Sequence, residues 1–224
     1  MKKKIDKKIL KSEVVEAAAK QAVADIIQMH EKLARPESLE GVTYKIKTPL
    51  SEHALYVTIN DIILNLGTEH ELRRPFEIFI NSKNMEHFQW IIALTRILSA
   101  VFRKGGDVTF LVDELRSVFD PHGGYFKKGG RYMPSIVAEI GDVIEQHMIA
   151  IGMLKKTVLD ERQQEHIDAK RQEYEQKRPA HKDAKEAGHA FPADAQLCKK
   201  CQTRAVISMD NCLTCLSCGD SKCG

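Results

Sequence analysis

Cysteine is absent from the first 197 residues of this 224-residue chain, and all six cysteines lie between Cys198 and Cys223. Secreted domains that are stapled by disulfides spread their cysteines through the fold, so this distribution argues against that class. Cysteines that cluster in one segment are typical of metal binding, redox chemistry or both. The chemistry of this chain is therefore expected in its last 27 residues.

Long apolar runs and a large net charge are also missing. No segment approaches the ~20 apolar residues of a membrane-spanning helix, so no membrane partner is expected. The formal net charge of +3 is too small to indicate nucleic acid as a partner. The basic start has no apolar segment behind it, and acidic residues appear early, so we expect neither a secretory signal nor a mitochondrial presequence. These features predict a cytoplasmic protein.

Motifs of an independent enzyme are missing as well. The chain contains no Walker loop, no GxGxxG string and no recognisable nucleophile–His–acid constellation. Its 43% hydrophobic and 29% charged residues are ordinary for a soluble globular protein, so a packed core is expected.

Hydrophobic periodicity divides the chain into parts with different expected structures. Apolar residues recur every three to five positions from Ile5 to Ile27, which predicts an amphipathic helix that ends at Pro36. After Lys155 charges dominate, and prolines and alanines then predict a flexible stretch. The expected parts are an amphipathic helix (1–35), an α+β domain (40–155), a charged helix (156–178), a flexible linker (179–196) and a zinc-ribbon and redox tail (197–224).

The predicted domain is of the α+β class, with a small antiparallel sheet and packed helices. β-branched residues and turn signals predict strands at 42–48, 56–65 and 74–81. A strongly apolar helix is expected at 87–102, a shorter one at 110–118, and a long one from about Pro134 to Leu154. The glycine-rich basic stretch at 122–131 is interpreted as a solvated turn or hairpin, with a phosphate-facing loop as the sharper alternative.

The cysteine spacing is Cys198-x2-Cys201-x10-Cys212-x2-Cys215-x2-Cys218-x4-Cys223. Two CxxC pairs at such a separation are the signature of a zinc ribbon. Each CxxC turn presents two thiolates, and two turns complete a tetrahedral shell of four sulfurs at ~2.3 Å from the ion. Residues 205–209 are expected to form the short hairpin between them. Two disulfides are the alternative, which a cytoplasmic setting disfavours.

Two cysteines remain after four have been assigned to a metal. If the second turn is formed by Cys212 and Cys215, the remaining pair is Cys218 and Cys223. If it is formed by Cys215 and Cys218, the remaining pair is Cys212 and Cys223, and Gly219 directly after Cys218 favours this option. Spacing alone leaves both options open. In either case two thiols are available for disulfide exchange.

The ending CLTCLSCGDSKCG at 212–224 resembles the C-terminal tail of adenosylcobalamin-dependent (class II) ribonucleotide reductases. The segments RRPFEIFIN at 73–81 and SIVAEIGD at 135–142 resemble the small domain upstream of that tail, which is named for a Thr-Ser-Cys-Pro-Asp (TSCPD) string. The resemblance covers roughly residues 40–155 and 195–224.

This resemblance implies roles for all six cysteines. In that family a pair of tail thiols re-reduces the active-site disulfide of the catalytic part and is itself re-reduced by thioredoxin or glutaredoxin. The resemblance assigns this redox shuttle to Cys218 and Cys223. It assigns Zn²⁺ to the other four, which are Cys198, Cys201, Cys212 and Cys215.

The chain also departs from the family. The naming string is absent, because residues 82–86 read SKNME, so no role of the family cysteine in that string is transferred. The reductase barrel, its radical-bearing loop and its cobalamin site need several hundred further residues. The resemblance thus implies a small accessory subunit that works beside a separate catalytic subunit carrying adenosylcobalamin.

A second hypothesis belongs to another functional class. Zinc ribbons also serve as binding modules for nucleic acid or for protein partners. However, no aromatic residue lies between Cys198 and Cys223 for a base to stack on. The surplus cysteine pair has no role in this hypothesis, so nucleic acid is not the expected partner.

Overall fold

The computed structural model describes residues 26–83, 88–156, 159–177, 191–192 and 194–223. Most of the predicted N-terminal helix lies outside these residues. Its described end, residues 26–30, is not helical, so the prediction is wrong for that part.

The sheet of the predicted α+β domain has three antiparallel strands in the order β1-β2-β3. Its strands are β1 (Glu40–Ile46), β2 (Leu55–Leu64) and β3 (Leu72–Ser82). Successive residues of a strand point to opposite faces of the sheet. On β2, Val57 and Ile59 are buried, whereas the neighbouring Tyr56 is exposed, so one face of the sheet carries the core. The expected class, α+β with a small antiparallel sheet, is confirmed.

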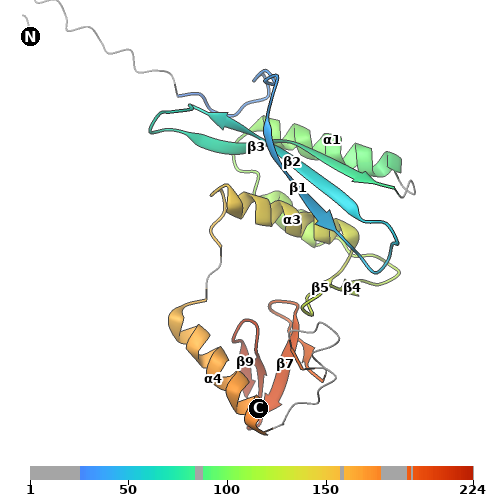
Figure 1. The fold of residues 1–224 in the computed structure, drawn as a ribbon, viewed down its shortest axis with the longest axis vertical. Helices are drawn as coiled ribbons and strands as arrows, with labels where there is room; N and C mark the ends of the chain where they lie inside the picture. The colour runs from blue at the N-terminus through green and yellow to red at the C-terminus, as the bar shows by residue number, and fades with distance from the viewer. Residues whose placement is uncertain (1–25, 84–87, 157–158, 178–190, 193, 224) are drawn as a thin grey trace, which may run out of the picture.

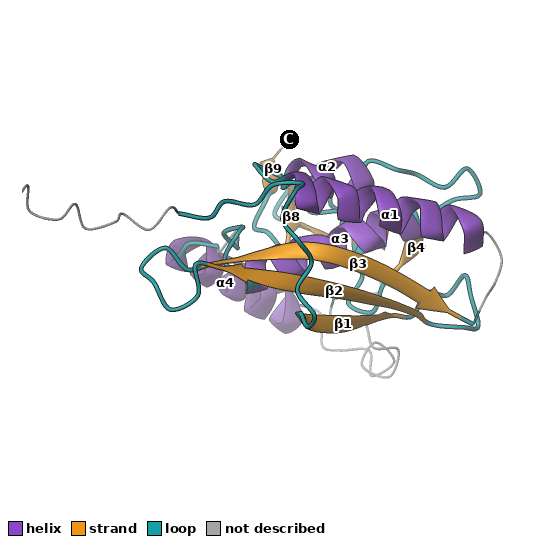
Figure 2. Cartoon of the chain, turned by 90° about the horizontal axis from the view of Figure 1, so that it is seen from above, coloured by secondary structure: helices purple, strands orange, loops and turns teal. Residues whose placement is uncertain are grey.

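Three helices cover the apolar face of this sheet (Figure 2). They are α1 (Phe88–Lys104), α2 (Phe110–Arg116) and α3 (Ile136–Ala150). The N-terminus of α3 is capped by Ser135, whose hydroxyl accepts a hydrogen bond from the amide of Ala138 at 3.0 Å. The end of α1 is followed by Gly105 at φ +80°, where a Cβ would lie only 2.0 Å from the carbonyl oxygen of Met29. Only glycine permits this close approach.

A short hairpin lies between α2 and α3. It consists of β4 (Tyr125–Phe126) and β5 (Tyr132–Met133), which pair antiparallel. This is the segment that the sequence predicted as a glycine-rich turn or hairpin. Figure 1 shows it between the sheet domain and the C-terminal part of the chain.

The C-terminal part is a four-stranded antiparallel sheet in the order β6-β7-β8-β9. Its strands are β6 (Gln196–Leu197), β7 (Arg204–Met209), β8 (Cys212–Cys215) and β9 (Ser221–Cys223). Residues 205–209, predicted as a short hairpin, belong to strand β7, and the turn that joins β7 to β8 is formed by Asp210 and Asn211. We call this sheet the ribbon.

Helix α4 (Glu161–Lys177) packs on the ribbon. Tyr174 contacts the apolar cluster of the ribbon, and Ile167 lies 3.4 Å from the position of a Cβ on Gly219. Phe191 and Ala195, which were predicted to belong to a flexible linker, pack in the same cluster, so that prediction is wrong for these residues. We call residues 159–177, 191–192 and 194–223 together the ribbon arm.

None of the helices described in the structure is long and apolar enough to cross a membrane.

Candidate metal and redox centre

Four cysteine sulfurs of the ribbon meet in one cluster. Cys198 and Cys201 precede β7, Cys215 ends β8, and Cys218 lies in the turn before β9. All four Sγ atoms lie within 4.8 Å of one another. Cys198 and Cys215 are buried, and the other two are partly exposed. Four sulfurs at this spacing could hold a metal ion.

The distances fit a tetrahedral zinc shell. The Sγ atoms of Cys198 and Cys218 lie 3.8 Å apart, and those of Cys201 and Cys215 lie 3.7 Å apart. Bonds of ~2.3 Å to a central ion in a tetrahedron place the sulfurs about 3.8 Å from one another. The donor set and its geometry therefore match a structural Zn²⁺ site of four thiolates.

Two tight turns with matching backbone geometry present these sulfurs. In the first, the amide of Gln202 donates to the carbonyl of Cys198 at 3.0 Å, and Gln202 has φ +52°. In the second, the amide of Gly219 donates to the carbonyl of Cys215 at 2.9 Å, and Gly219 has φ +73°. Glycine is the residue that adopts this left-handed conformation without steric cost, which explains its place directly after the second pair.

Burial and hydrogen bonding set the ionisation of the thiols. Burial raises the pKa of Cys218 to about 11 and raises the pKa of Cys215 as well. Burial also opposes ionisation of Cys201, but hydrogen bonds from Thr203 and from the neighbouring thiols lower its pKa to about 7. Cys201 is thus the first of these three thiols to ionise. Metals bind the thiolate form, so ion binding would release protons from the others.

The remaining two cysteines form a disulfide. Cys212 on β8 faces Cys223 on β9 in the strand register, and their sulfurs are bonded to each other. Strand β9 is at the edge of the ribbon, and all its residues are exposed. The disulfide therefore lies where another protein can reach it.

This arrangement corrects the set of cysteines implied by the family resemblance. The resemblance placed Cys212 in the metal cluster and paired Cys218 with Cys223. In the structure Cys218 takes the place of Cys212, and Cys212 pairs with Cys223. The reason is local, because the turn that ends in Gly219 presents Cys218, whereas Cys212 faces the last strand. The other predicted cluster members, Cys198, Cys201 and Cys215, do lie together.

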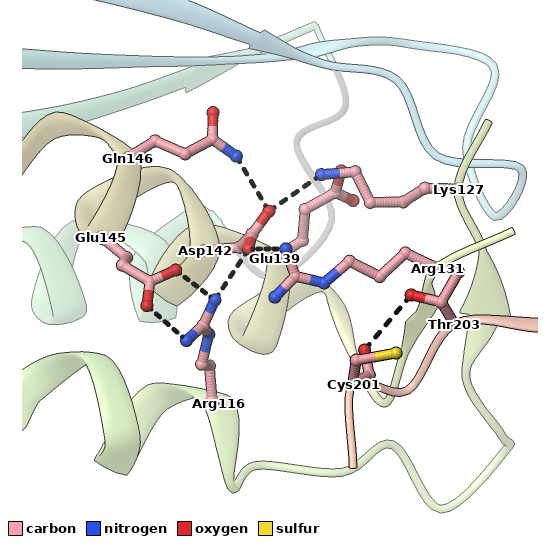
Figure 3. Close-up of polar contacts among 9 residues, drawn as sticks. All are labelled: Arg116, Lys127, Arg131, Glu139, Asp142, Glu145, Gln146, Cys201 and Thr203. Carbon is pink, nitrogen blue, oxygen red and sulfur yellow. Dashed lines mark hydrogen bonds and ion pairs between the residues drawn. The ribbon is translucent and has the colours of Figure 1, made fainter. Parts of the chain in front are cut away.

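A polar network that the sequence did not reveal lies beside the first of these turns (Figure 3). Asp142 on α3 is almost completely buried, and it pairs with Arg116 at 2.9 Å, Lys127 at 3.1 Å and Arg131 at 2.7 Å. Lys127 also pairs with the buried Glu139 at 3.1 Å. Lys127 and Arg131 of the hairpin are thus engaged by buried carboxylates of this chain, which argues against the phosphate-facing interpretation.

The network reaches the metal cluster through the backbone. Arg131 and Thr203 form an isolated antiparallel bridge between the hairpin and the ribbon. The Thr203 hydroxyl donates to the carbonyl oxygen of Cys201 at 3.3 Å (Figure 3). Asp142 of the sheet domain is therefore connected to the backbone of the cluster residue Cys201 through Arg131 and Thr203.

Comparison with known proteins identifies the sheet domain. A family model described as the TSCPD domain matches residues 25–148. No curated protein and no solved structure matches the chain. The matched residues include the three-stranded sheet and the β4–β5 hairpin but not the ribbon arm. The TSCPD domain is typical of B12-dependent ribonucleotide reductases. Since the match spans more than half of the chain, this protein belongs to the TSCPD domain family.

Proposed function

We propose that this chain is the accessory redox subunit of a B12-dependent ribonucleoside-diphosphate reductase. Its ribbon arm re-reduces the active-site disulfide of a separate catalytic subunit, which carries adenosylcobalamin. The observation that carries this proposal is the partition of the six cysteines in a chain of the TSCPD family. Four sulfurs form a closed cluster, and the two others form an exposed disulfide on an edge strand.

The exchange chemistry uses only the exposed pair. In the reduced arm, one thiolate of the pair Cys212 and Cys223 attacks the disulfide of the catalytic subunit and releases one of its thiolates. The second thiol of the pair then attacks the mixed disulfide and releases the other. Two electrons pass to the catalytic subunit, and the Cys212–Cys223 disulfide forms. A thioredoxin- or glutaredoxin-class dithiol protein reduces this disulfide by the same two steps.

The four-sulfur cluster has a structural role in this proposal. Cys198, Cys201, Cys215 and Cys218 would hold Zn²⁺ and fix the turns that carry β7 and β8. Zinc bound by four thiolates has no open coordination position, so the ion keeps four thiols out of disulfide exchange. The redox pair then has no competing partner within the ribbon.

The test is the double variant Cys212→Ser/Cys223→Ser, assayed with the catalytic subunit. We expect one round of reduction by the prereduced catalytic subunit to persist, because the active-site thiols are untouched. Multiple turnover driven by thioredoxin should fall to background, because the electron relay is broken. Lys222→Ala is the matched control, since it alters the same exposed strand and leaves both cysteines in place.

If the double variant supported thioredoxin-driven multiple turnover at the wild-type rate, this result would contradict the proposal. Binding of the chain to DNA or RNA, weakened by salt, together with no effect on a reductase would instead support the binding-module hypothesis.

A further inference from the structure

The β4–β5 hairpin holds the ribbon through backbone hydrogen bonds. The amide of Tyr132 donates to the carbonyl of Gln202 at 2.7 Å, and the amide of Arg204 donates to the carbonyl of Gly130 at 2.7 Å. Between these two bonds, Arg131 and Thr203 pair as an antiparallel bridge. The first cysteine turn of the ribbon thus joins the edge of the hairpin as a short additional strand.

The hairpin is anchored from behind. Arg131 pairs with Asp142, and Lys127 pairs with both Asp142 and Glu139, whose carboxylates are nearly inaccessible to solvent. Tyr125 donates a hydrogen bond to the same Glu139. Buried carboxylates that are fully paired hold their partners in one geometry. The hairpin therefore offers a fixed edge to the ribbon.

The contact between hairpin and ribbon is polar and small. Within the described part of the chain, no apolar cluster contains side chains of both the sheet domain and the ribbon arm. The arm instead has its own apolar cluster, built by α4 and the ribbon. Separation of the arm from the hairpin would therefore expose a few backbone groups to water but no hydrophobic core.

The docked ribbon leaves its disulfide uncovered. The hairpin contacts residues 202–204, at the start of β7. The disulfide joins β8 to β9, and β9 is the strand at the edge of the sheet away from β6 and β7. A dithiol protein can thus reach Cys223 while the ribbon remains on the hairpin.

We infer that residues 125–133 are a docking site for the ribbon arm of the same chain. The docked arm is the resting position, in which an external dithiol protein reduces the Cys212–Cys223 disulfide. The arm leaves the hairpin when it delivers electrons to the catalytic subunit. This inference rests on the proposed function for the delivery step, whereas the docking itself can be measured on the isolated chain.

The test compares two glycines of the hairpin turn. Gly130 and Gly129 have similar positive φ values of +82° and +93°, so a side chain strains the backbone at both. A Cβ on Gly130 would lie 3.5 Å from the carbonyl oxygen of Arg204, whereas a Cβ on Gly129 would meet nothing within 4 Å. Gly130→Trp should therefore displace the ribbon, and Gly129→Trp is its matched control.

The first measurement is amide hydrogen exchange on the isolated full chain. In Gly130→Trp the amides of Tyr132 and Arg204 should exchange at least about tenfold faster than in Gly129→Trp, since both lose their acceptors. Exchange in α3 should not change, which shows that the sheet domain is intact. Equal exchange of the two amides in both variants would overturn the docking. Arg131→Gln, which weakens the anchor, should accelerate the same amides and serves if Gly130→Trp misfolds.

The second measurement compares the rate of disulfide reduction and the turnover with the catalytic subunit in the two glycine variants. Reduction of the disulfide by a thioredoxin-class protein should have the same rate in Gly130→Trp and Gly129→Trp, and turnover with the catalytic subunit should be retained in both. Loss of turnover in Gly130→Trp alone, with unchanged disulfide reduction, would show that the docked arm is the delivering position and overturn the inference. Failure of the proposed function would appear separately, as wild-type turnover of the double cysteine variant.

Discussion

Nη1 of Arg131 lies 2.7 Å from Oδ1 of Asp142, although the Asp142 side chain is only 1% exposed. Arg116 and Lys127 complete the neutralisation of this buried carboxylate. An unpaired charge in such a position is strongly destabilising, whereas a paired one is tolerated. The ion pair between Arg131 and Asp142 therefore holds the hairpin on α3. The position of the hairpin edge that contacts the ribbon thus depends on the ionisation of Asp142.

The stability of the sheet domain should decrease in acid because of Asp142. Burial alone would raise the pKa of Asp142, but Arg131, Lys127 and Arg116 outweigh it and hold the pKa below its ordinary value. A carboxylate with a lowered pKa in the folded state stabilises the fold above its unfolded pKa of about 4, and this contribution disappears as the pH falls through the lower folded pKa. Urea denaturation at neutral pH and near pH 3 should show this loss.

The variant Asp142→Asn should remove that pH dependence. We expect it to cost about 2–4 kcal/mol at neutral pH, because three cations lose their shared partner. The difference from the wild type should shrink in acid, where Asp142 itself is protonated. An equal difference at both pH values would contradict the role assigned to the ionised carboxylate.

Zinc affinity should distinguish Cys218, which lies in the four-sulfur cluster, from Cys212, to which the family resemblance assigned the metal. Cys218→Ser removes a sulfur from the four-thiol cluster, and we expect the affinity for Zn²⁺ to fall by more than about 100-fold. Cys212→Ser leaves the cluster complete, so zinc affinity should remain close to that of the wild type. Competition with a chromogenic chelator measures both. The reverse result would restore the partition that the resemblance implied.

His147 should be a residue of the core and not a metal ligand. Its Nε2 lies 2.8 Å from Asp61, and its Nδ1 lies 2.9 Å from the Tyr44 hydroxyl. The variant His147→Ala leaves Asp61 with one partner fewer, so we expect a loss of about 3 kcal/mol in the free energy of unfolding. His122→Ala is the control, since the side chain of His122 is 95% exposed. Comparable destabilisation by both variants would contradict this assignment.

Helix α4 should depend on the ribbon for its stability. It consists largely of charged and polar residues, and Ile167 is its buried apolar residue. An isolated helix of this length is only marginally stable in water. We therefore expect Ile167→Asp to accelerate amide exchange throughout α4, with a local loss of about 2–4 kcal/mol. Glu165→Ala, on the exposed side, should leave exchange unchanged, and equal effects would show that the packing contributes nothing.

The sequence predicted the sheet domain well because its patterns are local. Alternating β-branched residues in β2 and the apolar run of α1 are read directly from neighbouring positions. The buried carboxylates Glu139 and Asp142 were not predicted, because their partners lie on a hairpin and on another helix. Charged residues in an apolar helix indicate an exposed face unless such distant partners are known.

The division of the six cysteines between the metal cluster and the disulfide could not be predicted from spacing alone either. Cys215 belongs to two overlapping CxxC strings, so spacing permits either choice of second turn. The glycine after Cys218 was the local signal for the choice that the structure makes. The packing of α4 was missed because Ile167 and Tyr174 are two apolar residues among many charges. Its contact with the ribbon follows from tertiary structure alone.

The packing of α4 on the ribbon bears on the proposed delivery step. In the delivery step proposed above, helix α4 would move together with the ribbon, because Tyr174 and Ile167 pack against it. The 17 residues of α4 are about 25 Å long. The unit that would carry the disulfide in the proposed delivery step is therefore larger than the ribbon alone.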